Sequence, residues 1–381
     1  MDIRIYDPPE EERPRFAAVA RLTAAVSVTA VERHYTPGYF EITVPTEARH
    51  AEKLTEGRLV WIDGGMWGIV DSVHCAQSEG GDLLTASGRQ LKGLTADRIT
   101  IPPDVNPIAG AQGYDTVTGS TEACMKHYAA ANLGPGASAS RRVCGLTIAA
   151  DLGRGVAEDK YMSRHDRLDI VLQDLGEASQ LGYDIIPDLQ THRLLFDMVA
   201  GEDHTAGQSR RKRVIFDIRR RTALAMSYDY AAGDSRNVFY TTMAGAEFAD
   251  EALTVTYLRE GEEEQRGIRR REQHLSVSAD TPIAGEEYSE LRRKALIEAE
   301  RYKAAESLTC EIAEGPYRYR EDYRLGDLVT LQCQGWGVSM DARLTEMQTE
   351  YSAGGIRHTA VFGTAPLTVF GRLQRQLRRG G

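Results

Sequence analysis

A strand, a Pro-Gly turn and a second strand near the N-terminus constrain the fold of this chain most. The run covers residues 33–45 and reads RHYTPGYFEITVP. Pro37 presets the first dihedral of a turn, and Gly38 can supply the positive φ that a type II turn requires at the next position. Apolar and polar residues alternate over 39–44, which is the pattern of a strand with one buried face. The run therefore predicts a half-buried β-hairpin.

Three further strand-like runs follow the hairpin. They read GRLVWIDG at 57–64, WGIVD at 67–71 and LLTASGRQL at 83–91, and glycines separate them. A last strand is expected at 97–104, DRITIPPD, where a double proline ends the pattern. These runs predict a β-domain over residues 1–105.

Residues 106–208 change to a mixed α and β pattern. A first helix is expected to begin with Ser120 or Thr121 as its N-cap and to end at 133–135, where glycine and proline follow a leucine. A second helix is expected to begin at 163–166 and to stop at 181–182. Two strands are then expected, at 183–186 and 193–199.

Strand-like sequence returns after residue 208, around a charged insertion. Residues 209–240 and 308–366 are rich in strand patterns, and a long hairpin is expected over 342–363. The insertion at 241–307 ends in a segment rich in Glu, Lys, Arg and Ala, which predicts a helix from about 285 to 307. Residues 367–381 are short and basic.

Composition places the chain among globular proteins and excludes several classes. The 381 residues carry a net charge of −10, which argues against sequence-independent DNA binding because phosphate contacts need a cationic surface. Five scattered cysteines form no CxxC pair, so neither a disulfide framework nor a structural zinc site is predicted. No apolar run approaches the roughly 20 residues of a membrane span, and the start of the chain lacks the pattern of a signal peptide.

Catalytic and metal-binding motifs are absent from the sequence. The nine histidines are dispersed, and no HExxH, GxSxG, GxxxxGK[ST] or GxGxxG occurs. Cys124 and His127 are spaced like two ligands on one helix face, but no second pair completes a zinc site. Asp197, Asp203 and His204 could supply an acid and a base, although a strand followed by a polar turn explains them better. We therefore expect no catalytic, cofactor-binding or metal-binding residues.

Two basic runs invite a nucleic-acid hypothesis. They are residues 210–213, RRKR, and residues 219–221, RRR. Neither has the interleaved aromatic residues on which bases stack. Against the acidic balance of the chain, they are better interpreted as solvated faces or as ion-pair partners at subunit contacts.

The order of four motifs in the N-terminal region resembles a family of phage tail proteins. RIYD at 4–7 comes first, then RHYTPGYFE at 33–41, then the VWIDG and WGIVD runs, then SGRQL at 87–91. YRLGDLVTL at 323–331 resembles an element of the last β-domain of the same proteins. This pattern is similar to that of siphophage Gp37-like tail proteins, which are relatives of tail-associated-lysin N-terminal domains and of contractile-tail baseplate hubs. The positions that carry the family signature are Tyr35, Pro37, Gly38, Phe40, Gly88, Arg89, Gly326, Asp327 and Gly363.

The resemblance implies an α+β, mainly β fold with two tandem tail-tube-like β-barrel domains. It places the first barrel at 1–105 and an α+β domain at 106–208. The second barrel would combine 209–240 and 308–366 around an inserted α+β segment at 241–307, and 367–381 would be a basic C-terminal tail.

The resemblance also implies a structural role at the tail tip of a virion assembled in the bacterial host cytoplasm. Three copies would form a ring that closes or extends the tail tube. The ring would anchor the distal tail protein, the tape-measure protein and tail fibre or receptor-binding proteins, and DNA would pass through it without specific binding. Two alternatives stay open: a tail-associated cell-wall hydrolase, for which too few residues follow Gly363, where the family pattern closes, and a spike-base component of a phage-derived secretion or injection system.

Overall fold

The computed structural model describes residues 1–77, 81–102, 114–156, 159–244, 255–257, 266–278, 302–313 and 315–363. The chain divides into two compact units. The first consists of Met1–Ser227 and Thr309–Phe362, and the second of Tyr228–Leu308 and Gly363–Gly381.

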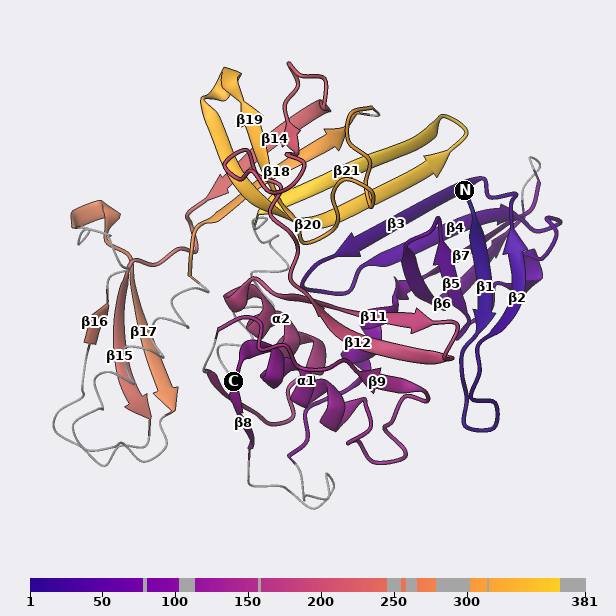
Figure 1. Ribbon diagram of the computed structural model, residues 1–381, viewed down its shortest axis with the longest axis horizontal. Helices are drawn as coiled ribbons and strands as arrows, with labels where there is room; N and C mark the ends of the chain where they lie inside the picture. Colours follow the sequence, from indigo (N-terminus) through magenta and orange to yellow (C-terminus); the bar gives the residue numbers. More distant parts are fainter. Residues whose placement is uncertain are drawn as a thin grey trace. The chain divides into compact units, whose positions relative to one another are not determined.

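The first seven strands form an antiparallel sheet in the order β3-β4-β7-β6-β5-β1-β2 (Figure 1). Their bounds are β1 Ile3–Asp7, β2 Ala17–Leu22, β3 Ser27–Arg33, β4 Tyr39–Pro45, β5 Leu59–Ile62, β6 Met66–Ala76 and β7 Leu83–Gln90. The predicted hairpin is confirmed as β3 and β4. Phe40, Ile42 and Val44 are buried on one face of β4, as the alternation requires, and they lie in the core of this sheet.

The strand expected at 97–104 is wrong for the residues that the structure describes. A 3₁₀-helix, η2 Leu91–Asp97, ends there, and a single bridge between Ile99 and Arg167 follows. Backbone groups of this segment bond to the loop before α2 instead of to a strand: Thr100 N–H donates to Asp166 O, and Leu168 N–H donates to Arg98 O.

The mixed segment contains both expected helices. Its elements are β8 Asp115–Gly119, α1 Thr121–Asn132, β9 Leu146–Ile148, β10 Asp159–Ser163, α2 Leu168–Ser179, β11 Gly182–Asp188 and β12 Arg193–Val199. Ser120 is the N-cap of α1, because its hydroxyl accepts a hydrogen bond from Ala123 N–H. β8 pairs with β10, β11 with β12 in an antiparallel hairpin, and β9 runs parallel to β12.

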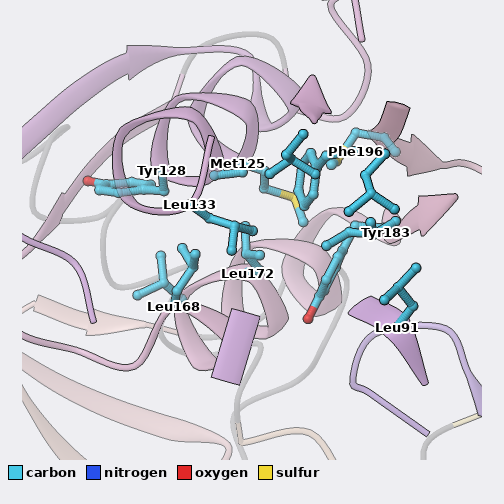
Figure 2. Close-up of a cluster of buried hydrophobic side chains, with 14 of the residues drawn as sticks. Leu91, Met125, Tyr128, Leu133, Leu168, Leu172, Tyr183 and Phe196 are labelled. Carbon is cyan, nitrogen blue, oxygen red and sulfur yellow. The ribbon is translucent and has the colours of Figure 1, made fainter. Parts of the chain in front are cut away.

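The two helices pack with the β11–β12 hairpin around one hydrophobic core. Figure 2 shows Met125 and Tyr128 of α1 near Leu168 and Leu172 of α2, with Phe196 of β12 to one side. Several side chains of the N-terminal sheet and η2 join the same core: Tyr6, Phe16, Leu59 and Leu91. Burial of this shared core couples the α+β segment to the N-terminal sheet.

The C-terminal strands continue the N-terminal sheet. They are β13 Ile215–Phe216, β14 Ala223–Ala231, β18 Ala305–Ile312, β19 Leu328–Cys333, β20 Val338–Ser352 and β21 Gly355–Gly363, with η4 Gln334–Trp336 between β19 and β20. β20 pairs antiparallel with β19, with β21 and with β3, so the predicted hairpin of 342–363 is confirmed.

The resulting sheet has 13 strands, and β3 and β20 are the pair that joins its two halves. Among the described strands its pairing does not close into a barrel. The fold is therefore mainly β, as expected, and is built on one large, mainly antiparallel sheet.

The second unit contains a small three-stranded sheet in the order β16-β15-β17. Its bounds are β15 Val238–Ala244, β16 Val255–Tyr257, η3 Gly267–Arg269 and β17 Glu272–Ser278. Phe239, Leu275 and Tyr302 form its core.

The helix expected at about 285–307 falls largely outside the described residues. Its expected end is wrong, since residues 305–307 begin strand β18. The reason is the sheet: β18 lies between β14 and β21, and its ladder outweighs the helical preference of the sequence.

Candidate functional site

The turn end of the β3–β4 hairpin is closed by a side chain from β7. Gln90, which is buried, accepts a hydrogen bond from Gly38 N–H at 3.1 Å through its side-chain oxygen. Gln90 N–H in turn donates to Gly38 O at 2.9 Å. The hairpin end is thereby bonded to the strand beside it.

The expected role of Gly38 is wrong. Gly38 does not lie among the residues with positive φ, so it does not serve a type II turn. A Cβ at this position would instead lie 1.7 Å from Val31 O, a distance that no side chain tolerates. Glycine is needed here because two backbone segments approach each other closely.

A second close approach surrounds Phe40, the next signature position. Phe40 is fully buried, and a Cβ at Gly88 of β7 would lie 2.9 Å from its ring and 1.9 Å from Ile69 O. A Cβ at Gly68 of β6 would lie 2.5 Å from the same ring. The two glycines leave the space that the aromatic ring fills between neighbouring strands.

Arg89 fixes η2 to the sheet. Its guanidinium donates to both carboxylate oxygens of Asp97, at 2.6 and 2.8 Å, and its Nε lies 3.4 Å from Asp71. The two-point contact with Asp97 orients the 3₁₀-helix that follows β7.

The second set of signature positions, Gly326 and Asp327, contacts the first set through His34. Gly326 has φ +93°, and a Cβ on it would lie 2.5 Å from the His34 ring. A Cβ on Gly182, at the start of β11, would lie 2.4 Å from the same ring. We call the region formed by His34, Gly182, Gly201, Gly326 and Asp327 the junction.

Asp327 organises the chain on both sides of the junction. One carboxylate oxygen accepts from Glu202 N–H at 2.7 Å, and the other accepts from Arg324 N–H at 2.7 Å. A Cβ on Gly201 would lie 1.9 Å from Gly326 O, so the segment after β12 passes directly against the loop before β19. Desolvation by burial raises the pKa of Asp327, while these hydrogen bonds favour its charged form.

Tyr35 and Pro37 flank the junction on the hairpin. The Tyr35 ring stands edge-on to the His34 ring, with centroids 4.6 Å apart, and burial raises the pKa of Tyr35 to about 12. Pro37 is partly buried in the turn. Gly363, the last signature position, has φ +80° and lies against the backbone of Glu306 in the second unit.

Sequence reasoning missed Lys92, which connects the hairpin to the α+β segment. Its side chain is 1% exposed. The ammonium donates to the carbonyl oxygens of Arg33, His34 and Tyr183, the last two at 3.1 and 3.0 Å. Desolvation lowers the pKa of Lys92 to about 8, although the nearby Asp184 carboxylate favours its charged form. The signal in the sequence was a lysine three positions after Arg89 of the Gly88-Arg89 motif and next to buried Leu91.

His34 is buried and held neutral. Burial lowers its pKa well below the usual range, and the Lys92 ammonium and the Arg343 guanidinium lower it further. Arg343 of β20 donates to Ala200 O at 2.8 Å and to Gly326 O. Cations from η2 and β20 thus both act on His34, so the junction disfavours an additional proton.

The residues considered for catalysis or metal binding do not form a site. His127 donates toward the Asp115 carboxylate at 2.9 Å, whereas Cys124 is buried in α1. Asp197 pairs with Lys126 and Arg154 at 2.9 and 2.8 Å. Within the described residues no group of three His, Cys, Asp or Glu side chains could hold a metal ion. In the same residues, no helix has the length and apolar character needed to cross a bilayer.

His204 lies beside Asp327 of the junction and forms no acid–base pair with Asp197. Its Nδ1 contacts Lys212 O at 2.8 Å, and its Nε2 lies 3.6 Å from Asp327. The polar turn after β12 is therefore structural.

The two basic runs are engaged within the chain. Arg211 pairs with Glu202 at 2.9 Å, and Lys212 pairs with Asp322 at 2.6 Å. Arg219 donates to the side chain of Gln334, and Arg220 lies 3.9 Å from Asp217. These intrachain partners neutralise part of the charge that a nucleic-acid site would require.

Most signature positions thus lie in or beside the β3–β4 hairpin and the junction. Comparison with known proteins identifies the family of the chain. The model of the Siphovirus ReqiPepy6 Gp37-like protein family matches residues 2–364. The chain belongs to this family. The resemblance inferred from the motifs is thereby confirmed. A comparison of the sequence with curated proteins gives no match.

Solved structures of phage tail proteins share the fold. A tail protein from Neisseria meningitidis MC58 has a TM-score of 0.58 at 14% identity and covers 95% of this chain and 96% of its own. The 43 kDa tail protein of prophage MuSo2 from Shewanella oneidensis has a TM-score of 0.54 at 11% identity, and the match covers 96% of this chain and 98% of that protein. Prophage tail protein gp18 from Listeria monocytogenes has a TM-score of 0.53 at 13% identity, and the match covers 100% of this chain and 99% of that protein. The chain therefore shares its fold with phage tail proteins along nearly its whole length.

Proposed function

We propose that this protein is the hub of a phage tail tip, a structural ring that closes or extends the tail tube. The observation that carries the proposal is the family match over residues 2–364, which covers nearly the whole described chain, and solved phage tail proteins that share this fold support it. Two β-regions per chain, residues 1–105 and 209–240 with 308–366, would give six similar units in a homotrimer. Such a three-fold ring fits beneath a six-fold tube.

The pairing of β3 with β20 supports this architecture. Six residue pairs, from Glu346–Arg33 to Tyr351–Val28, join the N-terminal and C-terminal halves in one antiparallel ladder. Arg33 of β3 also pairs with Glu346 of β20 at 2.6 Å. Main-chain pairing holds the two β-regions in a fixed register, as a ring that continues a tube requires.

The junction gives the proposed hub its stiffness. Glycine contacts with His34 and the buried bonds of Lys92 and Asp327 connect the hairpin, the α+β segment and the strands after residue 323. Because such backbone contacts leave no room for sliding, the parts would move together. The ring would open by movement between subunits when DNA passes.

The partners follow from the position at the tip. The ring would contact the distal tail protein above, tail fibre or receptor-binding proteins around it, and the tape-measure protein in its channel. Assembly would take place in the host cytoplasm, and the finished protein would reside in the virion. The role would be structural and not enzymatic.

Gold labelling of virions tests the position. A C-terminal affinity tag on the full-length chain, detected with a gold conjugate, is expected at the distal end of the tail only. Label along the whole tail would identify a tube protein instead. If the label were found on particles without a capsid, and the genes of these particles lay beside genes of secreted effectors, the spike-base alternative would be favoured.

Incubation with purified cell walls tests the structural role. We expect the protein to release no soluble wall fragments. Release that is abolished by replacing one side chain would establish the hydrolase alternative.

A further inference from the structure

A cationic pocket lies where the α1–β9 connection meets the turn between β11 and β12. Its volume is about 460 Å³, and its walls include Arg142, Thr147, Thr191, His192 and Arg193. No aspartate or glutamate lines it, although the chain as a whole carries a net charge of −10. The pocket therefore has a local charge opposite to that of the protein, a combination that attracts anions.

The two guanidinium groups are available to a ligand. Arg193 is exposed, and within the described residues no hydrogen bond or ion pair engages its side chain. Arg142 uses one nitrogen to donate to Ala137 O at 3.0 Å and retains its other donors. Two guanidinium groups at one pocket suit a doubly charged oxyanion, which accepts several N–H bonds at once.

The carboxylate of Asp188, beside the pocket, is already engaged. Asp188 faces Arg193 across the β11–β12 ladder. Its oxygens accept from Gln190 N–H at 2.9 Å and from the Thr191 hydroxyl at 2.7 Å, which lowers its pKa. Asp188 thus shapes the turn and does not neutralise the arginines by a direct contact.

The turn itself is held in an unfavourable conformation. His192 has φ +56°, a region that few residues other than glycine adopt, and its Nδ1 is buried without a hydrogen-bond partner. Such strain is typical of segments that position a binding surface. Here the strained residue and its neighbours Thr191 and Arg193 all line the pocket.

Part of the pocket lining is apolar. Pro14, Pro135, Val143 and Leu146 belong to it, and they offer contact to a short carbon skeleton. A bare inorganic ion would leave these residues without a contact. A phosphate monoester of a polyol suits both the cationic and the apolar lining residues, because its phosphate carries close to two charges at pH 7 and its carbon chain is small.

We propose that this pocket binds the phosphate monoester of a small polyol, with Arg142 and Arg193 holding the phosphate. The ligand would be either a free polyol phosphate or the phosphorylated end of a polyanionic cell-surface polymer. This site is additional to the hub function and does not depend on it.

Calorimetric titration of the full-length protein tests the proposal with glycerol 3-phosphate as the probe. We expect saturable binding, weakened at least about tenfold by Arg193→Gln and by Arg142→Gln, and abolished when both are changed. Arg21→Gln serves as the control, since Arg21 is an exposed arginine paired with Asp2 outside the pocket. His192→Asn, which keeps a residue tolerant of positive φ, tests the turn without unfolding it.

Further probes distinguish a surface polymer from a free ester as the ligand, and they also test binding of sulfate and of DNA. Stronger binding of a short poly(glycerol phosphate) with a phosphorylated end than of glycerol 3-phosphate would assign the site to a surface polymer, and equal binding would assign it to a free ester. Lack of binding, binding unchanged in the double variant, or equal binding of sulfate would overturn the proposal. Competition by a DNA oligonucleotide without a terminal phosphate would also overturn it.

Discussion

The imidazole of His34 occupies the space in which a side chain at Gly326 would have to lie. The closest ring atom is 2.5 Å from the position of a Cβ on Gly326. His34 follows β3 and Gly326 precedes β19, so the contact joins the two ends of the sequence inside the first unit. It is the point at which the N-terminal and C-terminal family motifs meet.

Replacing Gly326 is expected to weaken the fold strongly. Gly326→Ala combines an unfavourable φ of +93° with a clash against His34, and we expect a loss on the order of 3 kcal/mol in the free energy of unfolding. Gly355→Ala is the matched control, since Gly355 has φ +108° with no atom within 4 Å of the added Cβ. It should cost only about 1 kcal/mol. Denaturant unfolding of both variants measures the difference. Similar losses in the free energy of unfolding would show that the contact with His34 does not destabilise Gly326→Ala.

Gly38 provides a second test, based on close approach and not on φ. Because a Cβ would lie 1.7 Å from Val31 O, Gly38→Ala, Gly38→Asn and Gly38→Val should all lower the melting temperature substantially. Gly335→Ala, in open space without positive φ, should change it little. If Gly38→Asn had a mild effect and Gly38→Val a severe one, the result would support a type II turn with positive φ at position 38 and would contradict the close approach to Val31 O.

His34 predicts a loss of stability in acid. Its pKa is well below the usual range in the folded protein and about 6.5 in the unfolded chain. Below pH 6.5 the unfolded chain therefore binds a proton that the folded chain does not, so stability falls as pH decreases toward the folded pKa. We expect the melting temperature to drop more between pH 7.5 and pH 5.5 in the wild type than in His34→Gln. Equal drops would mean that His34 titrates normally.

The isolated protein should not bind duplex DNA tightly. The basic residues Arg211, Lys212 and Arg220 already have acidic neighbours, and the chain carries ten more acidic than basic side chains. At physiological ionic strength we expect no salt-sensitive binding in a fluorescence anisotropy titration. Micromolar binding that weakens with salt, and that Arg219→Gln reduces, would contradict a ring through which DNA passes without being bound.

Local patterns in the sequence were sufficient to predict the hairpin, both helices of the α+β segment and the β20–β21 hairpin. Each depends on alternation or capping within a short window, as at Ser120 and over residues 39–44. The reason for glycine at position 38 was not predictable, because it depends on Val31 O of the adjacent strand.

The junction was not predictable either. His34 appears in the sequence as one of nine dispersed histidines, and only the tertiary fold brings it to Gly182 and Gly326. Lys92 is hidden for the same reason, since its carbonyl partners lie on β3, on the hairpin and on β11. The family signature marked the correct region through Gly326 and Asp327 without indicating these contacts.

The central claim is that three copies of this chain form the hub ring. An interface well above ~2,000 Å² in total is expected between obligate subunits. Reconstruction of the tail tip from intact virions by electron cryomicroscopy, without imposed symmetry, measures the copy number directly. The account predicts one ring of three chains, each contributing two β-regions, below the last six-fold ring of the tube. Six copies in that ring, or copies repeated along the tail, would contradict it.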